Sequence, residues 1–298
     1  MHHYTGIYAP TVTPFTSQGQ VALDAIPPYV EQLLNDGIDG LFVCGSTGEG
    51  MSLTESERME VAAAFTRAVS GRVPVMVQVG HTSVEAARRL AAHAQEIGAD
   101  AVAASPPSYF RIDSVECLVA TMAHIAGGAP RLPFFYYHIP SLTHVSLSMP
   151  EFLRQAEGAI PNLLGTKFTN PALDEFSRCL DWRDGAGTHF WGVDEMFLPA
   201  WSVGASAAIG TSYNVAAPLY REIAQCFARN DLPGARAAQR RGIALIELLV
   251  RYPFLAALKV ILNRRGLELG GCRLPNQNLT NDMQDRFIEE YDAWEANA

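Results

Sequence analysis

The stretch VPVMVQVGHTSVEAARRLAAHAQEIGADAVAAS, residues 73–105, carries the pattern that decides the fold. It begins with an apolar run (73–79) that is typical of a buried strand. A helical pattern follows over 83–98, with Ser83 placed to cap its start and Gly98 to end it. A second apolar run (101–105) comes directly afterwards. A strand, a helix and another strand joined by short turns predict a parallel strand pair with a crossover helix.

The same alternation recurs along most of the chain. A helical pattern also follows the second apolar run, where Thr54 and Glu57 have the spacing of a capping box and Gly71 provides a stop. Eight such units in about 230 residues predict a single (β/α)8 TIM barrel, with a doubly wound open sheet as the alternative. The strand-like runs are 6–12, 40–44, 73–79, 101–105, 133–137, 162–168, 188–192 and 205–210.

The pattern becomes purely helical from residue 231, with helices expected over 232–250, 254–265 and 280–296. We therefore expect residues 1–230 to form the barrel. Residues 231–298 should form a C-terminal helical extension that packs on it, giving one structural unit of the α/β class.

Composition excludes several classes of partner. The net charge of −9 argues against nucleic acid, whose phosphate backbone selects basic surfaces. The five cysteines are widely spaced and form no CxxC motif, which indicates reduced thiols in a cytoplasmic protein without a zinc site. No signal peptide is visible, and the apolar run 243–262 carries Glu247, Arg251, Pro253 and Lys259. We expect packed helices there and no membrane association.

Polar and glycine-rich residues gather where the predicted strands end. In a barrel these carboxyl ends meet on one face, where TIM-barrel active sites lie. The candidate site therefore combines the segments 45–50 (GSTGEG), 106–110 (PPSYF), 136–140 (YYHIP), 167–169 (KFT), 192–195 (GVDE) and 210–214 (GTSYN).

Lys167 lies at this face and is one of only two lysines in the chain. A confined apolar site disfavours the charged form of a lysine and lowers its pKa. The neutral amine can then attack a ketone and form a Schiff base. The alternative is a structural lysine at the end of a strand, whose ammonium reaches solvent or pairs with a carboxylate. The residues alone leave both interpretations open.

The remaining polar residues allow simpler interpretations too. GSTGEG lacks the GK[ST] ending of a Walker loop and does not match GxGxxG. Its backbone N–H groups suit a carboxylate, or the segment is merely a tight turn. Asp194 and Glu195 fit the paired carboxylates of a hydrolase or, more economically, ligands for sugar hydroxyls. His138 and His144 have no further metal ligand nearby in the sequence, so no metal site is expected, and Lys259 is interpreted as structural.

Five motifs occur together in a recognisable order. They are GSTGE (45–49), YHIP followed by Thr143, GTKFT (165–169), GVDEMF (192–197) and GTSYN (210–214). In order and spacing they resemble the pyruvate-dependent class I aldolases and lyases, the family of dihydrodipicolinate synthase and N-acetylneuraminate lyase. The resemblance covers essentially the whole chain. It implies a TIM-barrel carbon–carbon lyase of carbohydrate metabolism that uses a covalent Schiff base and no metal or organic cofactor.

Within this family the loops are most similar to those of the lyases. Leu142 stands where the synthases carry an arginine for a second carboxylate, and Ser46-Thr47 replaces their usual pair of threonines. The resemblance therefore implies reversible cleavage of N-acetylneuraminate, a sialic acid, to N-acetylmannosamine and pyruvate. The alternatives are another pyruvate-dependent aldolase or dehydratase acting on a 2-keto-3-deoxy sugar acid, dihydrodipicolinate synthase (disfavoured by Leu142), and a catalytically silent binding barrel.

The resemblance also implies a role for each site residue. Lys167 would form the Schiff base at C2, and Tyr137, helped by Ser46, would transfer the proton of the C4 hydroxyl. Tyr109 would reach in from a neighbouring subunit, which implies a homotetramer built from dimers. Ser46 and Thr47 would bind the substrate carboxylate. The sugar portion would be bound by Thr169, Gly192, Asp194, Glu195, Gly210 and Thr211.

His144 departs from the family pattern, which commonly has glycine directly after the threonine of this loop. Glycine adopts a positive φ easily, and histidine tolerates it less freely. We expect the imidazole either to narrow the pocket or to point to solvent.

Overall fold

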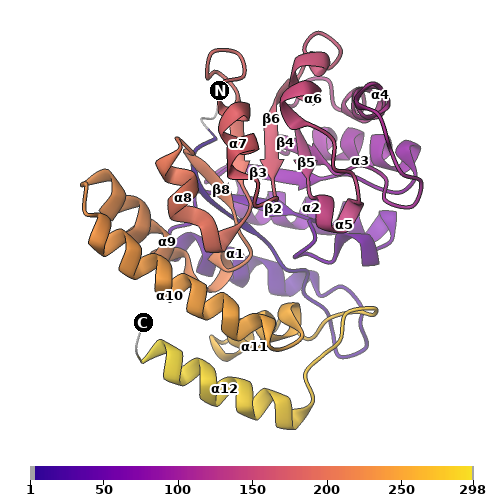
Figure 1. Cartoon of the computed structure of the whole chain (residues 1–298). Coiled ribbons are helices and arrows are strands. Elements are labelled where there is room, and N and C mark those ends of the chain that lie inside the picture. Colours follow the sequence, from indigo (N-terminus) through magenta and orange to yellow (C-terminus); the bar gives the residue numbers. More distant parts are fainter. Residues whose placement is uncertain (1–3, 297–298) are drawn as a thin grey trace.

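The computed structural model describes residues 4–296 and contains a closed barrel of eight parallel strands (Figure 1). Neighbouring strands pair in chain order, and β1 pairs with β8 to close the barrel. The predicted (β/α)8 barrel is therefore confirmed, and the open-sheet alternative is wrong. The strands are β1 (Gly6–Pro10), β2 (Gly40–Val43), β3 (Val75–Gln78), β4 (Ala101–Ala104), β5 (Phe134–His138), β6 (Leu163–Phe168), β7 (Thr188–Trp191) and β8 (Ala207–Ile209).

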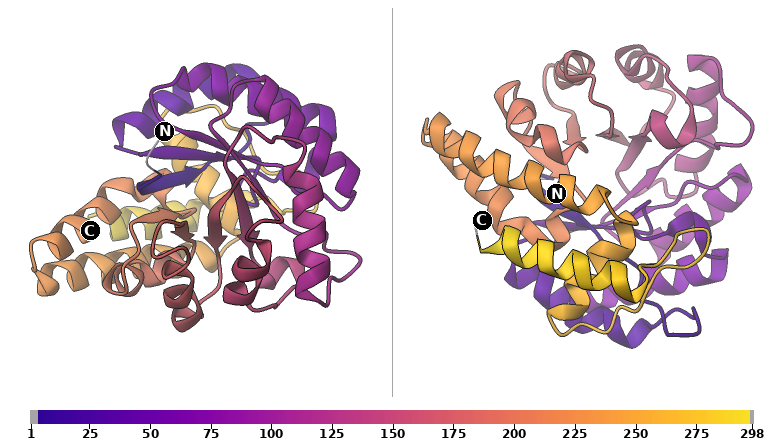
Figure 2. Two further views of the ribbon diagram at one scale, coloured as in Figure 1. Left: turned by 90° about the horizontal axis from the view of Figure 1, so that it is seen from above. Right: turned by 60° about the horizontal axis from the view of Figure 1, so that its bottom comes forward.

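Helices surround the barrel, as Figure 2 shows from above. Three short 3-10 turns, η1 (Leu23–Ala25), η2 (Gly50–Ser52) and η3 (Asp194–Met196), lie between the main elements. The helices that follow the strands are α1 (Ile26–Asn35), α2 (Glu55–Val69), α3 (Val84–Glu96), α4 (Val115–Ala126), α5 (Pro140–Thr143), α6 (Met149–Ala156), α7 (Leu173–Leu180), α8 (Phe197–Ser202) and α9 (Tyr213–Ala228).

Local sequence explains where α2 and α3 begin and end. Thr54 and Glu57 form the predicted capping box at the start of α2, and Ser83 caps α3. Gly98, with φ of +78°, follows the end of α3 as predicted. At the end of α2 the left-handed conformation begins at Ser70, with φ of 51°, one residue before the expected Gly71.

The strands bury both of their faces, which explains their nearly continuous apolar sequence. Successive residues point alternately into the barrel and towards the helices. In β5, Phe135 and Tyr137 join the interior cluster, while Phe134 and Tyr136 belong to the layer between barrel and helices. Parity along a strand therefore decides which side chains can reach the barrel mouth.

A β-bulge in β6 changes this parity just before Lys167. Phe134 pairs with Leu163 and Phe135 with Gly165, so Leu164 is an extra residue on β6. Beyond it Lys167 lies opposite the inward-facing Tyr137. Without the extra residue, side chains would alternate regularly along β6, and Lys167 would point towards the helices as Leu163 does. The bulge therefore turns the lysine into the barrel.

The C-terminal helices α10 (Leu232–Val250), α11 (Phe254–Arg264) and α12 (Asn281–Glu295) match the three helices expected there. They lie together along one side of the barrel (Figures 1 and 2). Gln239 of α10 connects the extension to the barrel, because its side chain bonds the backbone of Asp194 and of Leu198. None of the helices within residues 4–296 is long and apolar enough to cross a membrane.

Candidate active site

A pocket of about 400 Å³ opens at the carboxyl ends of the strands. Gly210 does not line it but lies against Asp194, which does, since a Cβ at Gly210 would come within 2.1 Å of the Asp194 Oδ1. The lining of the pocket comes from β5, β6 and β8, from the segments that follow β2, β5, β6, β7 and β8, and from α10 and α11. Nine of the predicted site residues line it: Ser46, Thr47, Tyr137, Lys167, Thr169, Gly192, Asp194, Glu195 and Thr211.

Lys167 is buried between two aromatic rings in this pocket. Its Nζ lies 4.1 Å from the ring centroid of Phe42 and 4.0 Å from that of Tyr137. Burial lowers the pKa of the amine, and the nearby Tyr137 and Asp194 only partly oppose this effect. An amine with a lowered pKa, open to the pocket, has the properties of a Schiff-base nucleophile.

Several hydroxyl groups line the pocket together with the amine. The Ser46 Oγ lies 3.5 Å from the Tyr137 Oη, and the Thr47 and Thr211 hydroxyls are hydrogen-bonded at 2.8 Å. Within residues 4–296 the backbone amides of Ser46 and Thr47 donate to no other group. These free donors can bind an anionic group beside Lys167.

Asp194 provides a buried carboxylate in the same pocket. It begins η3, and its Oδ2 accepts hydrogen bonds from the Ser212 N at 2.9 Å and the Ser212 Oγ at 2.6 Å. Burial raises the pKa of Asp194 to about 6, although the Ser212 bonds favour the ionised form. Glu195, by contrast, is exposed at the rim. A carboxylate that accepts hydrogen bonds is well suited to sugar hydroxyls.

Gly192 has a steric role beside Thr169. A Cβ at Gly192 would lie 2.2 Å from the Thr169 Oγ1, just as one at Gly210 would collide with Asp194. Both positions therefore need glycine so that a polar side chain can occupy the pocket wall.

Tyr109 is the predicted catalytic residue that the structure does not bring into this pocket. Its side chain and that of Phe110 are each 78% exposed. A smaller cavity of about 70 Å³ lies on the other side of Ser46, and Leu142 and Thr143 help to line it. The role of Tyr109 in a neighbouring subunit stays a prediction.

His144 adopts the conformation that its glycine-like position requires, with φ of 57°. The residue is exposed and lines neither the main pocket nor the smaller cavity. The imidazole therefore points to solvent, and the main pocket keeps its width. Within residues 4–296 no group of three histidine, cysteine or acidic residues is arranged to hold a metal ion.

Several lining residues were missed by sequence reasoning. Ser141 lies inside the YHIP–Thr143 motif, so its position was a usable signal. Ile246 and Val250 of α10 and Phe254 of α11 also line the pocket. These three lie on amphipathic helices, where apolar residues ordinarily indicate core packing, and nothing local marked them.

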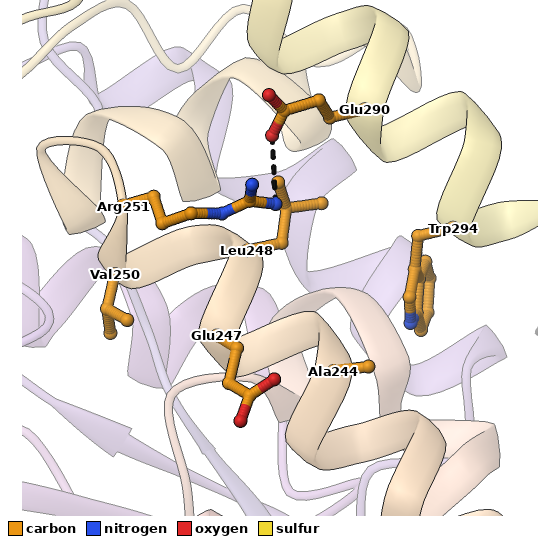
Figure 3. Close-up of a pocket in the computed structure, with 7 residues that line it drawn as sticks. All are labelled: Ala244, Glu247, Leu248, Val250, Arg251, Glu290 and Trp294. Carbon is orange, nitrogen blue, oxygen red and sulfur yellow. Dashed lines mark ion pairs between the residues drawn. The ribbon is translucent and has the colours of Figure 1, made fainter.

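A second hollow, of about 650 Å³, lies between α10 and α12 (Figure 3). There Arg251 forms an ion pair with Glu290 at 2.9 Å, and Val250 borders both this hollow and the main pocket. The hollow is larger, but its lining contains no buried nucleophile or hydroxyl: Ala244, Glu247, Leu248, Val250, Arg251, Glu290 and Trp294. The smaller pocket around Lys167 is therefore the candidate active site.

Known proteins share both the sequence and this architecture. N-acetylneuraminate lyase of Rattus norvegicus is 35% identical over 283 residues, which cover 93% of this chain and 88% of the rat protein. The solved structure of N-acetylneuraminate lyase (sialic acid aldolase) from Aliivibrio salmonicida superposes with a TM-score of 0.96 at 35% identity, covering 99% of this chain and 98% of that one. The lyase from Proteus mirabilis gives 0.95 at 33% identity, covering 97% and 98%.

The family assignment rests on nearly the full length of the chain. The sequence model of the dihydrodipicolinate synthetase family matches residues 3–293, from before β1 into α12. The barrel, the inward lysine of β6 and the relatives above agree with this match. The chain therefore belongs to the dihydrodipicolinate synthetase family.

Proposed function

We propose that this protein is a Schiff-base aldolase that cleaves N-acetylneuraminate reversibly to N-acetylmannosamine and pyruvate. The observation that carries the proposal is the buried amine of Lys167, enclosed by Phe42 and Tyr137 in a pocket with a hydroxyl-lined side. Relatives named N-acetylneuraminate lyase at 33–35% identity support the choice of substrate.

The first step joins the substrate to Lys167. The neutral amine attacks the C2 ketone, one proton is taken up from solvent and water leaves, which produces a protonated imine. Ser46 and Thr47 would hold the adjacent carboxylate with their hydroxyls and free amides. Because these donors lie beside the amine, the carboxylate would orient C2 towards the Lys167 Nζ.

The second step breaks the C3–C4 bond. Tyr137, with Ser46 beside it, would relay the proton of the C4 hydroxyl, which later reaches C3, while the electrons of the C3–C4 bond move into the protonated imine and form an enamine. The sugar half leaves as an aldehyde. Protonation of C3 and hydrolysis of the imine then release pyruvate and restore the amine. This route requires neither a metal ion nor an organic cofactor.

The sugar half would bind on the side of Asp194. Its carboxylate, Glu195 at the rim and the Thr169 and Thr211 hydroxyls offer acceptors and donors for sugar hydroxyls. Gly192 and Gly210 would contribute by leaving room for these side chains.

The active form would be a cytoplasmic homotetramer built from dimers, in which Tyr109 of a neighbouring subunit completes the proton relay. The exposed Tyr109–Phe110 pair and the cavity beside Ser46 support this arrangement, since an aromatic side chain could enter there. Free cysteines, three of them buried, support a reducing compartment.

Trapping with borohydride tests the covalent step. Incubation with pyruvate and borohydride should add one reduced pyruvyl group, located by peptide mass at Lys167. A Lys167→Met variant is the matched control, because the chain then retains only Lys259. Absence of label at Lys167 under saturating pyruvate would contradict the mechanism.

A substrate panel tests the sugar. Pyruvate release from N-acetylneuraminate should be far faster than from 2-keto-3-deoxygluconate, and condensation of pyruvate with aspartate semialdehyde should be poor. The reverse ranking of the two sugar acids would favour another aldolase of the family, while labelling of Lys167 would remain.

A further inference from the structure

We propose that the buried ion pair of Lys259 and Glu49 positions the loop that carries Ser46 and Thr47. A residue of the C-terminal extension would then determine how tightly the pocket holds the carboxylate of the keto acid. This inference rests on the proposed function, because that function assigns the binding of the substrate carboxylate to the loop of Ser46 and Thr47.

Lys259, on α11, is a fully coordinated ammonium. Its Nζ donates to the Thr13 carbonyl at 2.8 Å, to the Glu49 Oε1 at 2.9 Å and to the Gly271 carbonyl at 2.6 Å. An ammonium has three N–H donors, and each has one acceptor here. The side chain is 1% exposed. Lys259 therefore connects three parts of the chain: the loop after β1, the 45–50 loop and the segment after α11.

Glu49 is equally well coordinated from the other side. Its Oε2 accepts hydrogen bonds from the Arg273 N at 2.8 Å and the Asn276 Nδ2 at 3.1 Å, in addition to the Lys259 bond at Oε1. All three donors come from the C-terminal extension, more than 200 residues away along the chain. The loop of the active site is thus attached through one carboxylate.

The backbone of this loop requires such an attachment. Cys44 and Glu49, at its two ends, have positive φ of 60° and 53°, which non-glycine residues adopt at a cost. The middle is braced separately, because the Thr13 Oγ1 donates to the Gly48 carbonyl at 2.6 Å. Lys259 holds the carbonyl of the same Thr13. Loss of the ammonium would therefore loosen both supports beside Ser46 and Thr47.

A purely structural role would have a different signature. If the pair only stabilised the fold, its removal would lower the melting temperature but leave the affinity of the folded protein for pyruvate unchanged. If it positions the loop, the folded variant should bind pyruvate more weakly, because the donors for the carboxylate are displaced.

The test compares Lys259→Met, Glu49→Gln and the double variant in the full chain. Each is assayed well below its melting temperature, with folding checked by circular dichroism. The readout is the pyruvate concentration that gives half-maximal borohydride trapping at Lys167. We expect each single variant to raise it at least about tenfold, and the double variant to add little more, because both remove one interaction. If Lys259→Met does not fold, the isosteric Glu49→Gln carries the test.

Arg273→Gln is the matched control. The Arg273 guanidinium binds Glu57 and the carbonyls of Gly19 and Ser52, outside the 45–50 loop, and its backbone bond to Glu49 is kept. This variant should lose stability but trap pyruvate at the parental concentration. A half-maximal concentration within about twofold of the parent in a folded Lys259→Met or Glu49→Gln variant overturns the inference alone. A parent protein that traps no pyruvate overturns the proposed function as well.

Discussion

The two lysines of this chain are both buried but differ in the acceptors around their amino groups. Lys259 is bound by a carboxylate and two carbonyls, whereas Lys167 lies against the rings of Phe42 and Tyr137. Burial lowers the pKa of both side chains, but Glu49 opposes this effect at Lys259. The surroundings therefore support a charged ammonium at one lysine and a neutral nucleophile at the other.

Asp194 should make sugar binding depend on pH. Its pKa is raised to about 6, so the carboxylate is ionised at neutral pH and becomes protonated as the pH falls through 6. Protonation removes an acceptor for sugar hydroxyls. At pH 5, one unit below this pKa, only about a tenth of the Asp194 carboxylates are ionised. We therefore expect the KM for N-acetylneuraminate to rise about tenfold between pH 7.5 and pH 5.

Two comparisons isolate this effect. The pyruvate concentration for half-maximal trapping should change less over the same range, because pyruvate lacks the sugar portion. In Asp194→Asn the KM should be high and nearly independent of pH. A wild-type KM that stays constant from pH 7.5 to 5 would rule out this role for Asp194.

At the scale of the element, β6 depends on its bulge. The extra residue, Leu164, changes which face Lys167 occupies. Gly165 pairs with Thr188 and allows β6 to approach β7 closely. A Cβ at Gly165 would lie 1.6 Å from the Thr188 carbonyl oxygen. Backbone cannot yield as a flexible side chain does, so any larger residue must displace the strand.

Gly165→Ala should therefore damage activity more than stability. We expect a loss of roughly 1–3 kcal/mol of unfolding free energy from overpacking. A small displacement of the nucleophile should cost about 100-fold in kcat/KM. Denaturant unfolding and pyruvate-release kinetics measure the two effects.

Gly127→Ala is a suitable comparison for this variant. A Cβ there meets the backbone at 3.4 Å, an ordinary contact at the end of α4. It should change neither quantity appreciably. If Gly165→Ala retained parental activity, the close approach of β6 to β7 would not be what holds Lys167 in place.

At the scale of the whole molecule, the pocket draws on nearly the full length of the chain. Ser46 and Phe254 both line it, and α10 and α11 form part of its wall. The C-terminal extension therefore contributes to the candidate active site as well as to the fold. Tyr109, exposed on the outside of the same face, is the candidate contribution of a second subunit.

Subunit mixing tests that contribution. Tyr109→Phe and Lys167→Met should each be nearly inactive alone. If Tyr109 acts in a neighbouring subunit, a refolded equal mixture should regain about a quarter of parental activity, since half the dimers are mixed and each has one intact site. Mixtures without any recovery, from variants that each assemble like the parent, would show that Tyr109 does not act between subunits.

Much of the fold and of the candidate site could be predicted, because strands, helix starts and motifs are marked by local sequence patterns. Apolar runs at regular intervals predicted every strand of the barrel, and Thr54 with Glu57 predicted a helix start that the structure confirms. The carboxyl ends of barrel strands meet on one face, and this rule predicted that Ser46, Tyr137, Lys167 and Asp194 lie close together. All four line the same pocket. The strand runs and the capping box depend on residues a few positions apart, and the barrel rule then brings distant loops together.

What the sequence by itself determined was the barrel, the mouth where its polar loops meet and the candidate nucleophile. Only the tertiary structure decided which way Lys167 points, that His144 faces solvent, that α10 and α11 wall the pocket, and that Lys259 holds the loop of Ser46. The physical reason is that these outcomes depend on strand register and on contacts between residues that lie far apart in the chain, such as Lys259 and Glu49, which are 210 positions apart. Such contacts leave no periodic trace in the local sequence, because an apolar or charged residue looks the same whichever partner it later meets.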